Sequence, residues 1–241
     1  MTTISENLQG IHQRIRHACA TAGRDPSGVT LLAVSKSWPV PALAEAAVCG
    51  QRAFGESYVQ EGLIKINALA SLGLEWHFIG PIQSNKTRLI AENFAWVHSV
   101  DRFKIAERLS AQRPPHLPPL QICLQVNVSG EKSKAGCLPE EAAPLCHALL
   151  QLPHLTLRGL MTIPEPTEDV LRQRLQFARL RECRDRINTE IMDRPLDTLS
   201  MGMSHDLDAA ILEGATLVRI GTAIFGTRTR MVTKPAPHDE T

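Results

Sequence analysis

The amino-acid sequence predicts a single closed (β/α)8 TIM barrel, an α/β fold in which eight parallel strands alternate with helices. Short apolar runs bounded by turn residues alternate with amphipathic helical patterns along the chain. There are eight such units, which fits a closed barrel better than an open doubly wound sheet. The length of 241 residues is close to the about 250 that one barrel needs, so no stretch remains for a second domain.

The expected strands are short apolar runs between turn signals, as buried parallel strands are. The first strand follows the turn residues 25–28, and the third is ended by Gly80 and Pro81. In chain order the strands are expected at 30–35, 52–56, 75–79, 96–100, 120–128, 155–162, 197–201 and 216–220, with the last continuing into 221–226.

The expected helices are recognised by apolar spacings of three and four residues and by residues that start or stop a helix. Gly23 is expected to end the first helix, and Ser84 and Asp101 are expected to cap two later ones. In chain order the helices are expected at 3–22, 41–50, 57–70, 85–93, 102–112, 139–151, 167–192 and 204–213. Residues 1–230 would thus form the barrel with its N-terminal helix, and the polar segment 231–241 a flexible tail.

The composition argues against several functional classes. A net charge of +1 does not favour nucleic acid or a membrane surface as a partner. The N-terminus lacks the basic and apolar regions of a secretion signal, and no apolar run approaches the about 18 residues of a membrane span. The six cysteines show no zinc-type spacing, so we expect reduced thiols in a cytoplasmic protein without a metal site.

Lys36 stands at the end of the first expected strand. Alternation places Leu32, Val34 and Lys36 on one face, so an inward Val34 implies an inward lysine. Burial lowers the pKa of a lysine, and such an amine forms Schiff bases with carbonyl cofactors. The alternative is a lysine that leaves the barrel mouth and reaches water.

Two segments near the last strands are candidates for a phosphate site, because such barrels often bind phosphate on the loops after strands 7 and 8. In 200–204 (SMGMS), Gly202 permits close backbone approach and Ser204 is a natural N-cap of the next helix. In 219–222 (RIGT), Gly221 and Thr222 supply backbone and hydroxyl donors. Each segment alone also fits a simple turn or a packed strand end.

A phosphate site and an inward lysine together suggest pyridoxal 5′-phosphate (PLP) as the cofactor. Arg219 lies on the last strand, from which an arginine can reach the pyridine nitrogen of that cofactor. Because arginine stays charged, it would keep this nitrogen unprotonated and weaken carbanion stabilisation. A structural ion pair inside the barrel is the alternative for Arg219.

Six ordered motifs resemble the pyridoxal phosphate homeostasis protein family, also called the YggS/PROSC family. No single motif is specific, but the set spans nearly the whole chain from the first strand to the last. The motifs are 31–36 (LLAVSK), 54–61 (FGESYVQE), 76–86 (WHFIGPIQSNK), 158–161 (RGLM), 200–204 (SMGMS) and 218–226 (VRIGTAIFG).

The resemblance implies a barrel similar to the N-terminal domain of alanine racemase, with PLP bound as a Schiff base on Lys36. It also implies that Arg219 faces the pyridine nitrogen and that phosphate contacts come from both glycine-containing segments. The residues expected to bind the cofactor are Lys36, Ser57, His77, Ser200, Met203, Ser204, Arg219, Gly221 and Thr222.

Two of these positions carry a qualification. Ser57 stands where the family usually has asparagine, so a direct contact from the shorter hydroxyl is in doubt. His77 either lines the pocket or is satisfied inside the barrel wall.

The resemblance implies a PLP-binding carrier or regulator in vitamin B6 homeostasis that has no established catalysis. Apo PLP-dependent enzymes are possible partners, and the chain is expected to be a monomer. The alternative is a PLP-dependent amino-acid racemase, which needs a second acid/base group opposite the lysine. In the alanine racemase family that group resembles a tyrosine from a C-terminal domain, for which this chain has no expected counterpart.

Overall fold

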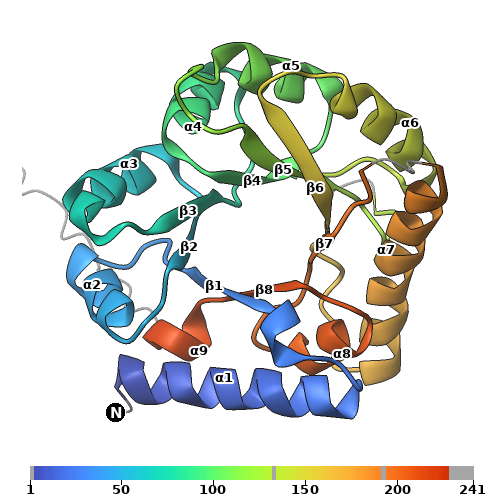
Figure 1. The fold of residues 1–241 in the computed structure, drawn as a ribbon. Helices are drawn as coiled ribbons and strands as arrows, with labels where there is room; N and C mark the ends of the chain where they lie inside the picture. Colours follow the sequence, from blue (N-terminus) through green and yellow to red (C-terminus); the bar gives the residue numbers. More distant parts are fainter. Residues whose placement is uncertain (1–2, 132–133, 191–193, 228–241) are drawn as a thin grey trace, which may run out of the picture.

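The computed structural model describes residues 3–131, 134–190 and 194–227, so the tail expected at 231–241 lies outside the described residues. Eight strands pair in parallel in chain order, and the last pairs with the first to close the barrel. Figure 1 shows the ring of strands with the helices around it. The expected (β/α)8 barrel is therefore confirmed.

The elements follow the expected order, with small shifts at their ends. The strands are β1 (Thr30–Val34), β2 (Ala53–Glu56), β3 (Glu75–Phe78), β4 (Trp96–Val100), β5 (Leu120–Gln125), β6 (Leu155–Met161), β7 (Thr198–Ser200) and β8 (Leu217–Ile220). The α-helices are α1 (Ile4–Thr21), α2 (Val40–Val48), α3 (Val59–Ala68), α4 (Thr87–Asn93), α5 (Phe103–Gln112), α6 (Pro139–Leu150), α7 (Val170–Glu190), α8 (Leu207–Leu212) and α9 (Thr222–Phe225). Short 3-10 turns occupy Pro26–Gly28, Ala70–Leu72 and Ser84–Lys86.

The main core lies between the outer face of the barrel and the helices. Phe54 and Phe78 are fully buried there, each from the middle or end of a short strand. A separate small cluster of Leu32, Ala53 and Leu217 lies on the other face of these strands. Because neighbouring side chains of a strand point to opposite faces, this second cluster marks the barrel interior.

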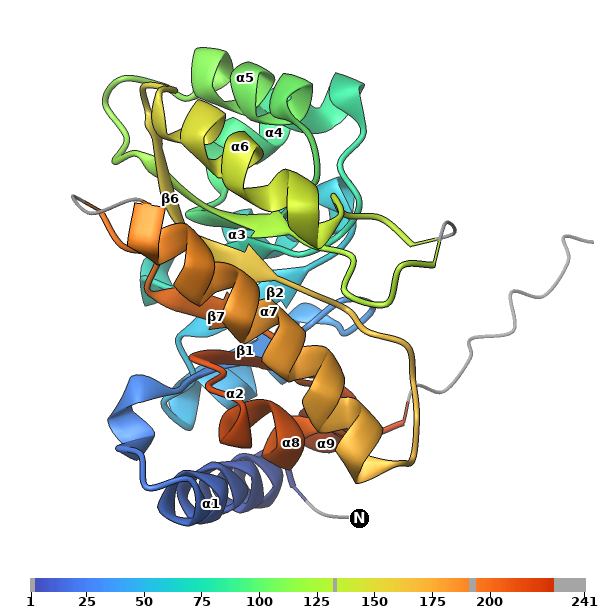
Figure 2. The same ribbon diagram turned by 90° about the vertical axis from the view of Figure 1, so that its right-hand side faces the viewer.

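Helix α1 packs across the part of the ring where β8 meets β1, beside α8 and α9 (Figures 1 and 2). Asn7 donates through its amide to the Ile224 carbonyl at 2.8 Å, and Arg14 pairs with Asp208 at 2.6 Å. The N-terminal helix α1 is therefore bonded to both α8 and α9, the short helices that follow β7 and β8.

Three expected element ends are wrong. Strand β5 ends at Gln125, and Val126 then forms an isolated bridge with Cys137. The segment expected to continue the last strand folds as α9 instead. Helix α8 begins at Leu207, with Asp206 at its N-cap position, so Ser204 does not cap it.

The two other expected caps are also wrong. Ser84 opens a 3-10 turn, and its carbonyl accepts a hydrogen bond from the Thr87 hydroxyl at 2.9 Å. Asp101 pairs with the Arg102 side chain at 2.9 Å, and the N-cap of α5 is Arg102 without a side-chain cap bond. The Asp101 carboxylate is thus paired with Arg102, and Ser84 lies inside a 3-10 turn before α4, so neither side chain caps the helix expected after it.

Candidate cofactor-binding site

Lys36 lies in the turn that follows β1, at the carboxyl end of the barrel. The strand ends at Val34, and the Trp38 amide donates to the Ser35 carbonyl at 3.0 Å, closing a four-residue turn around Lys36. The lysine is half-buried, and Ser37 has a positive φ of 65°. The structure thus puts Lys36 at the mouth where barrels of this class carry their functional residues.

The two glycine-containing segments lie beside Lys36 because β8 pairs with β1. Ile220 is in register with Ala33, and a Cβ at Gly221 would lie 3.1 Å from the Val34 carbonyl oxygen. Gly202 has a φ of 95°, and a Cβ there would lie 2.6 Å from the Cβ of Ala210. Gly202 therefore has a conformation and a contact that favour glycine, and at Gly221 a side chain would crowd the Val34 carbonyl.

The polar residues of these segments differ in exposure. Ser204 is half-buried, and its carbonyl accepts from Arg14 of α1 at 2.6 Å. The Met203 amide donates to the Asp206 carboxylate at 2.6 Å. Thr222 is exposed as the first residue of α9. Thr222 therefore lies exposed at the mouth of the barrel.

The Arg219 side chain crosses the barrel interior from β8 toward β6. Its guanidinium donates to the carbonyl and hydroxyl oxygens of Ser200 at 2.6 and 2.8 Å, and to the Thr162 carbonyl at 2.8 Å. Burial lowers the pKa of Arg219 to about 10, so the group remains a cation at neutral pH. These bonds fix the plane of a buried positive charge next to the phosphate candidates.

A chain of side chains continues from Arg219 down the barrel interior. The Ser200 hydroxyl is 2.8 Å from His98 Nδ1, His98 Nε2 is 2.9 Å from His77 Nδ1, and His77 Nε2 is 2.8 Å from Glu75 Oε1. The chain joins the carboxyl mouth to Glu75 at the start of β3, on the opposite mouth.

The direction of every hydrogen in this chain follows from its ends. An ionised Glu75 only accepts, so His77 carries its proton on Nε2 and accepts at Nδ1 from His98 Nε2–H. His98 Nδ1 then accepts from the Ser200 hydroxyl, whose oxygen accepts from Arg219, an obligate donor. Both ends therefore select the same tautomers.

The pKa values of these groups fit neutral imidazoles. Burial lowers the pKa of His77, and burial together with the positive charge of Arg219 lowers the pKa of His98 well below its usual value. The hydrogen bond from His77 lowers the pKa of Glu75. At neutral pH the chain therefore runs from a carboxylate through two uncharged rings to a cation.

His77 and Ser57 occupy different places from the other expected residues. Both ring nitrogens of His77 are used inside the barrel, which fits the alternative of a histidine satisfied in the wall. Ser57 follows β2 at the carboxyl mouth, and its backbone lies close to Gly80. A Cβ added at Gly80 would lie 2.2 Å from the backbone carbonyl oxygen of Ser57. Ser57 is thus held beside the end of β3.

Sequence reasoning missed His98, Glu75, Lys65 and Glu56. His98 had a usable signal, because Trp96 and His98 alternate on β4 and so share a face. Lys65 and Glu56 meet across a helix and a strand at 2.7 Å, a pairing that no local pattern specifies.

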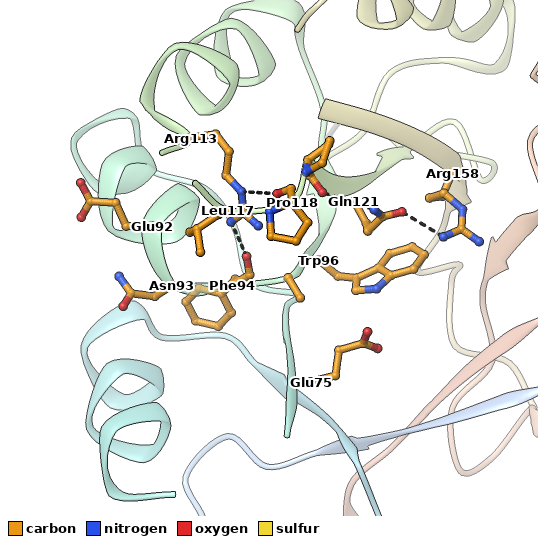
Figure 3. Close-up of a pocket in the computed structure, with 12 residues that line it drawn as sticks. Glu75, Glu92, Asn93, Phe94, Trp96, Arg113, Leu117, Pro118, Gln121 and Arg158 are labelled. Atoms are coloured by element: carbon orange, nitrogen blue, oxygen red, sulfur yellow. Dashed lines mark hydrogen bonds between the residues drawn. The ribbon is translucent and has the colours of Figure 1, made fainter. Parts of the chain in front are cut away.

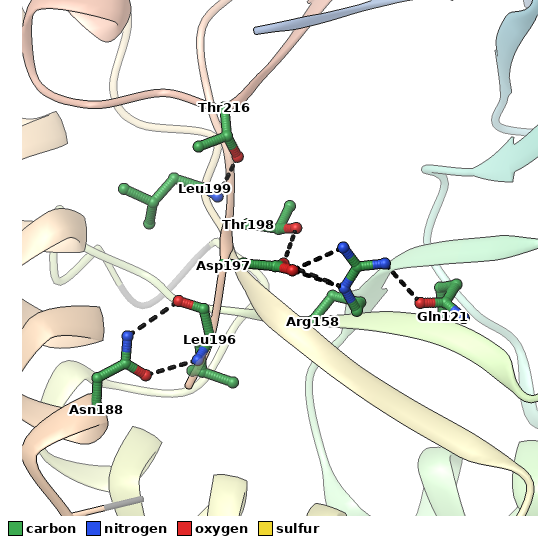
Figure 4. Close-up of polar contacts among 8 residues, drawn as sticks. All are labelled: Gln121, Arg158, Asn188, Leu196, Asp197, Thr198, Leu199 and Thr216. Carbon is green, nitrogen blue, oxygen red and sulfur yellow. Dashed lines mark hydrogen bonds and ion pairs between the residues drawn. The ribbon is translucent and has the colours of Figure 1, made fainter. Parts of the chain in front are cut away.

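The amino mouth carries a different kind of surface. A cavity of about 550 Å³ there is lined by residues that include Glu75, Trp96, Arg113 and Arg158 (Figure 3). Arg158 packs over the Trp96 ring at 5.0 Å, donates to Gln121 and pairs with Asp197 at 2.7 Å (Figure 4). The candidate residues are absent from this lining. A cavity of about 380 Å³ at the carboxyl mouth is lined in part by Ile79, Ser99 and Gln125.

Among residues 3–131, 134–190 and 194–227, no helix combines the length and apolarity needed to cross a membrane. The same stretch of chain contains no group of three or more His, Cys, Asp or Glu side chains arranged to hold a metal ion.

The sequence is similar to known proteins over nearly its whole length. Residues 5–229 match the family described as alanine racemase, N-terminal domain, so the chain has the fold of this barrel class. The chain is 62% identical over 228 residues to the pyridoxal phosphate homeostasis protein of Pseudomonas aeruginosa, covering 95% of this chain and 97% of that one. It is 53% identical over 232 residues to the protein of that name from Vibrio cholerae, covering 95% and 98%.

The structure of one relative has been solved with PLP bound. The structure of PipY of Synechococcus elongatus with PLP bound superposes with a TM-score of 0.79 at 36% identity, covering 93% of this chain and 100% of that one. On these matches the chain belongs to the pyridoxal phosphate homeostasis protein family.

Proposed function

We propose that this protein binds pyridoxal 5′-phosphate at the carboxyl mouth, holds it as a Schiff base on Lys36, and serves intracellular PLP homeostasis as a carrier or regulator. One observation supports this most strongly: Lys36, Arg219, Gly221 and Thr222 come together at one mouth because β1 pairs with β8. The relatives' names and the PLP-bound PipY structure point the same way.

The residues at this mouth fit the cofactor chemically. PLP supplies an aldehyde that an amine can attack; the lysine nitrogen bonds to the aldehyde carbon, and one water leaves. Ser204 and Thr222 offer hydroxyl donors, and the tight turns at Gly202 and Gly221 bring backbone close to a phosphate. In this proposal Ser200, Met203, Ser57 and His77 complete the surroundings, the last through His98.

Arg219 would face the pyridine nitrogen of the cofactor. A guanidinium with a pKa of about 10 does not take up a proton from the ring or give one to it at neutral pH. It therefore leaves the pyridine nitrogen unprotonated and the ring a weak electron sink. This property suits a protein that retains the aldehyde more than one that stabilises carbanions.

The protein would act in the cytoplasm as a monomer, without catalysis, and would release PLP to apo PLP-dependent enzymes. Residues 1–230 would form the functional unit. Mixing PLP-loaded protein with an apo-enzyme tests the transfer, through the gain of that enzyme's activity.

The defining experiment is borohydride reduction followed by peptide mass mapping. The purified protein is expected to show a visible absorbance band that reduction removes, leaving a pyridoxyl group on Lys36. Lys36→Ala is expected to lose both band and adduct because it removes the only amine assigned to the aldehyde. Lys104→Ala, at an exposed lysine on α5, is the matched control and keeps both. Cofactor still fixed by borohydride in Lys36→Ala would refute the assignment.

The racemase alternative is tested by turnover. Racemisation by two bases needs an acid/base group on the far side of the cofactor from Lys36. Tyr58, the single tyrosine of the chain, is 59% exposed at the N-cap of α3. We expect PLP-loaded protein to leave L-alanine and L-serine unchanged, and racemisation at ordinary enzyme rates would favour the racemase.

A further inference from the structure

We propose that Lys65 and Glu61, an ion pair one turn apart on α3, are positioning residues that hold both peptide groups flanking Lys36. This inference rests on the proposed function, because it treats Lys36 as the amine that takes the cofactor.

The Lys65 ammonium is fixed by three bonds. Its side chain is 4% exposed, and Nζ donates to the Ser35 carbonyl at 2.7 Å, to Glu56 at 2.7 Å and to Glu61 at 2.6 Å. An ammonium has three donors, so all of them are used. Lys65 therefore acts as a fixed point beside the mouth and does not extend to water as exposed lysines do.

Glu61 connects this fixed point to the other side of Lys36. Its Oε1, which accepts from Lys65, also accepts from the Ser37 amide at 2.5 Å. The Ser35 carbonyl and the Ser37 amide belong to the two peptide groups on either side of the Lys36 Cα. One ion pair thus orients both peptide planes, and these planes set the direction in which the Lys36 side chain leaves the backbone.

The turn has a conformational reason to need this support. Residues 35–38 form a β-turn, and its third residue, Ser37, has a φ of 65°. Glycine is favoured at the third position of a β-turn when φ there is positive. A non-glycine residue in this region is strained and persists where surrounding contacts determine it. The bonds from α3 are contacts of that kind, added to the Trp38 amide bond inside the turn.

Glu56 completes the cluster and decides which variant is informative. It is fully buried, accepts from the Ser35 hydroxyl at 2.6 Å and pairs with Lys65. Removing Lys65 would leave this buried carboxylate without its cation, a change that destabilises folds. Glu61 is 29% exposed and leaves the Lys65–Glu56 pair intact when replaced, so it is the better site for a test.

The experiment compares Glu61→Ala with Glu61→Gln in the full chain. In Glu61→Ala, amide hydrogen exchange of Ser37 is expected to rise in the PLP-free protein, because its acceptor is gone. Adduct formation on Lys36 with PLP is expected to slow by about tenfold or more, as small misplacements of a reacting group do. Binding of pyridoxine 5′-phosphate, which lacks the aldehyde, should stay unchanged. Glu61→Gln keeps an acceptor oxygen and should restore most of the rate.

The outcomes separate this inference from the proposed function. Glu107→Ala, at an exposed glutamate of α5, controls for loss of a surface charge and should behave as wild type. An unchanged adduct rate in Glu61→Ala, or an equal loss of pyridoxine 5′-phosphate binding, would overturn the positioning role. A wild-type chain that forms no Lys36 adduct would instead overturn the proposed function and this inference with it.

Discussion

At the residue scale, Ser200 connects the buried Arg219 cation to the neutral imidazoles of His98 and His77. Its hydroxyl oxygen accepts from Arg219 and its proton goes to His98, so both capacities of one small side chain are used. A polar chain inside a barrel is stable only when each member is satisfied in this way. Ser200 therefore fixes the Arg219 guanidinium, and its hydroxyl proton is given to His98 rather than to a phosphate.

The hydroxyls of Ser204 and Thr222 provide the first prediction at this scale. Replacing either by alanine removes one hydrogen bond to a charged phosphate, worth about 1.5–3 kcal/mol. Retention of PLP during dialysis should weaken by about ten- to a hundredfold. Ser71→Ala, at an exposed hydroxyl of a 3-10 turn before β3, should leave retention unchanged. Wild-type retention in both site variants would mean that the phosphate lies elsewhere.

At the element scale, glycines allow two backbone segments to lie closer together than a side chain would permit. Gly159 on β6 is in register with Thr198 on β7, and a Cβ at Gly159 would lie 1.8 Å from the Thr198 carbonyl oxygen. That oxygen is backbone and cannot rotate away. Gly10, within α1, has nothing within 4 Å of an added Cβ. One glycine is required by strand contact, and the other only weakens its helix.

These two glycines predict stability changes of opposite sign. Gly159→Ala should lower the free energy of unfolding by about 2 kcal/mol or more, because β6 and β7 must separate. Gly10→Ala should raise it by about 0.5–1 kcal/mol, because alanine restricts the unfolded chain and favours the helix. Urea unfolding of both variants beside wild type measures the changes. A neutral Gly159→Ala would contradict the strand contact.

The elements also show what the sequence could predict and what it could not. Strand identity was predictable because each strand is a short apolar run that must be buried on both faces. The ends of helices were less predictable: Asp206 turns its carboxylate back to the Met203 amide, so α8 starts three residues after Ser204.

The candidate site also contains residues that the sequence could predict and residues that it could not. Lys36, Arg219 and Gly221 were predictable because barrel topology brings the ends of β1 and β8 together. The Lys65–Glu61 support was not, because it joins a helix to a turn about thirty residues away in the chain. Such a contact depends on the angle at which α3 packs, which no local pattern encodes.

At the scale of the whole molecule, the barrel has two chemically distinct mouths joined by one polar chain. The carboxyl mouth holds the cofactor candidates. The amino mouth holds Glu75 (Figure 3) and the Arg158–Asp197 pair (Figure 4). Since barrel residues at the amino mouth mainly serve stability, we assign the Arg158–Asp197 pair to holding β6 and β7. The polar chain between the mouths is then a stability element that also orients Arg219.

The two histidines of this chain make the stability of the whole fold depend on pH. Burial lowers the pKa of both His77 and His98 in the folded protein, whereas in the unfolded chain each titrates near 6.5. The unfolded state therefore binds more protons as pH falls below about 6.5, and stability present above that pH is lost. Each histidine contributes a slope of up to about 1.4 kcal/mol per pH unit until its folded pKa is reached.

Two carboxyls, Glu56 and Asp206, oppose the loss of stability at low pH that the histidines cause. Burial raises the pKa of Glu56 and of Asp206, so the folded state holds their protons more tightly and gains stability as pH falls. The histidines are therefore followed individually by NMR of their ring resonances. We expect His77 and His98 to stay neutral in the folded protein at pH 6, and unfolding at that pH to take up protons. If His98 titrates near 6.5 in the folded protein, the chain from Glu75 to Arg219 does not have the direction assigned to it.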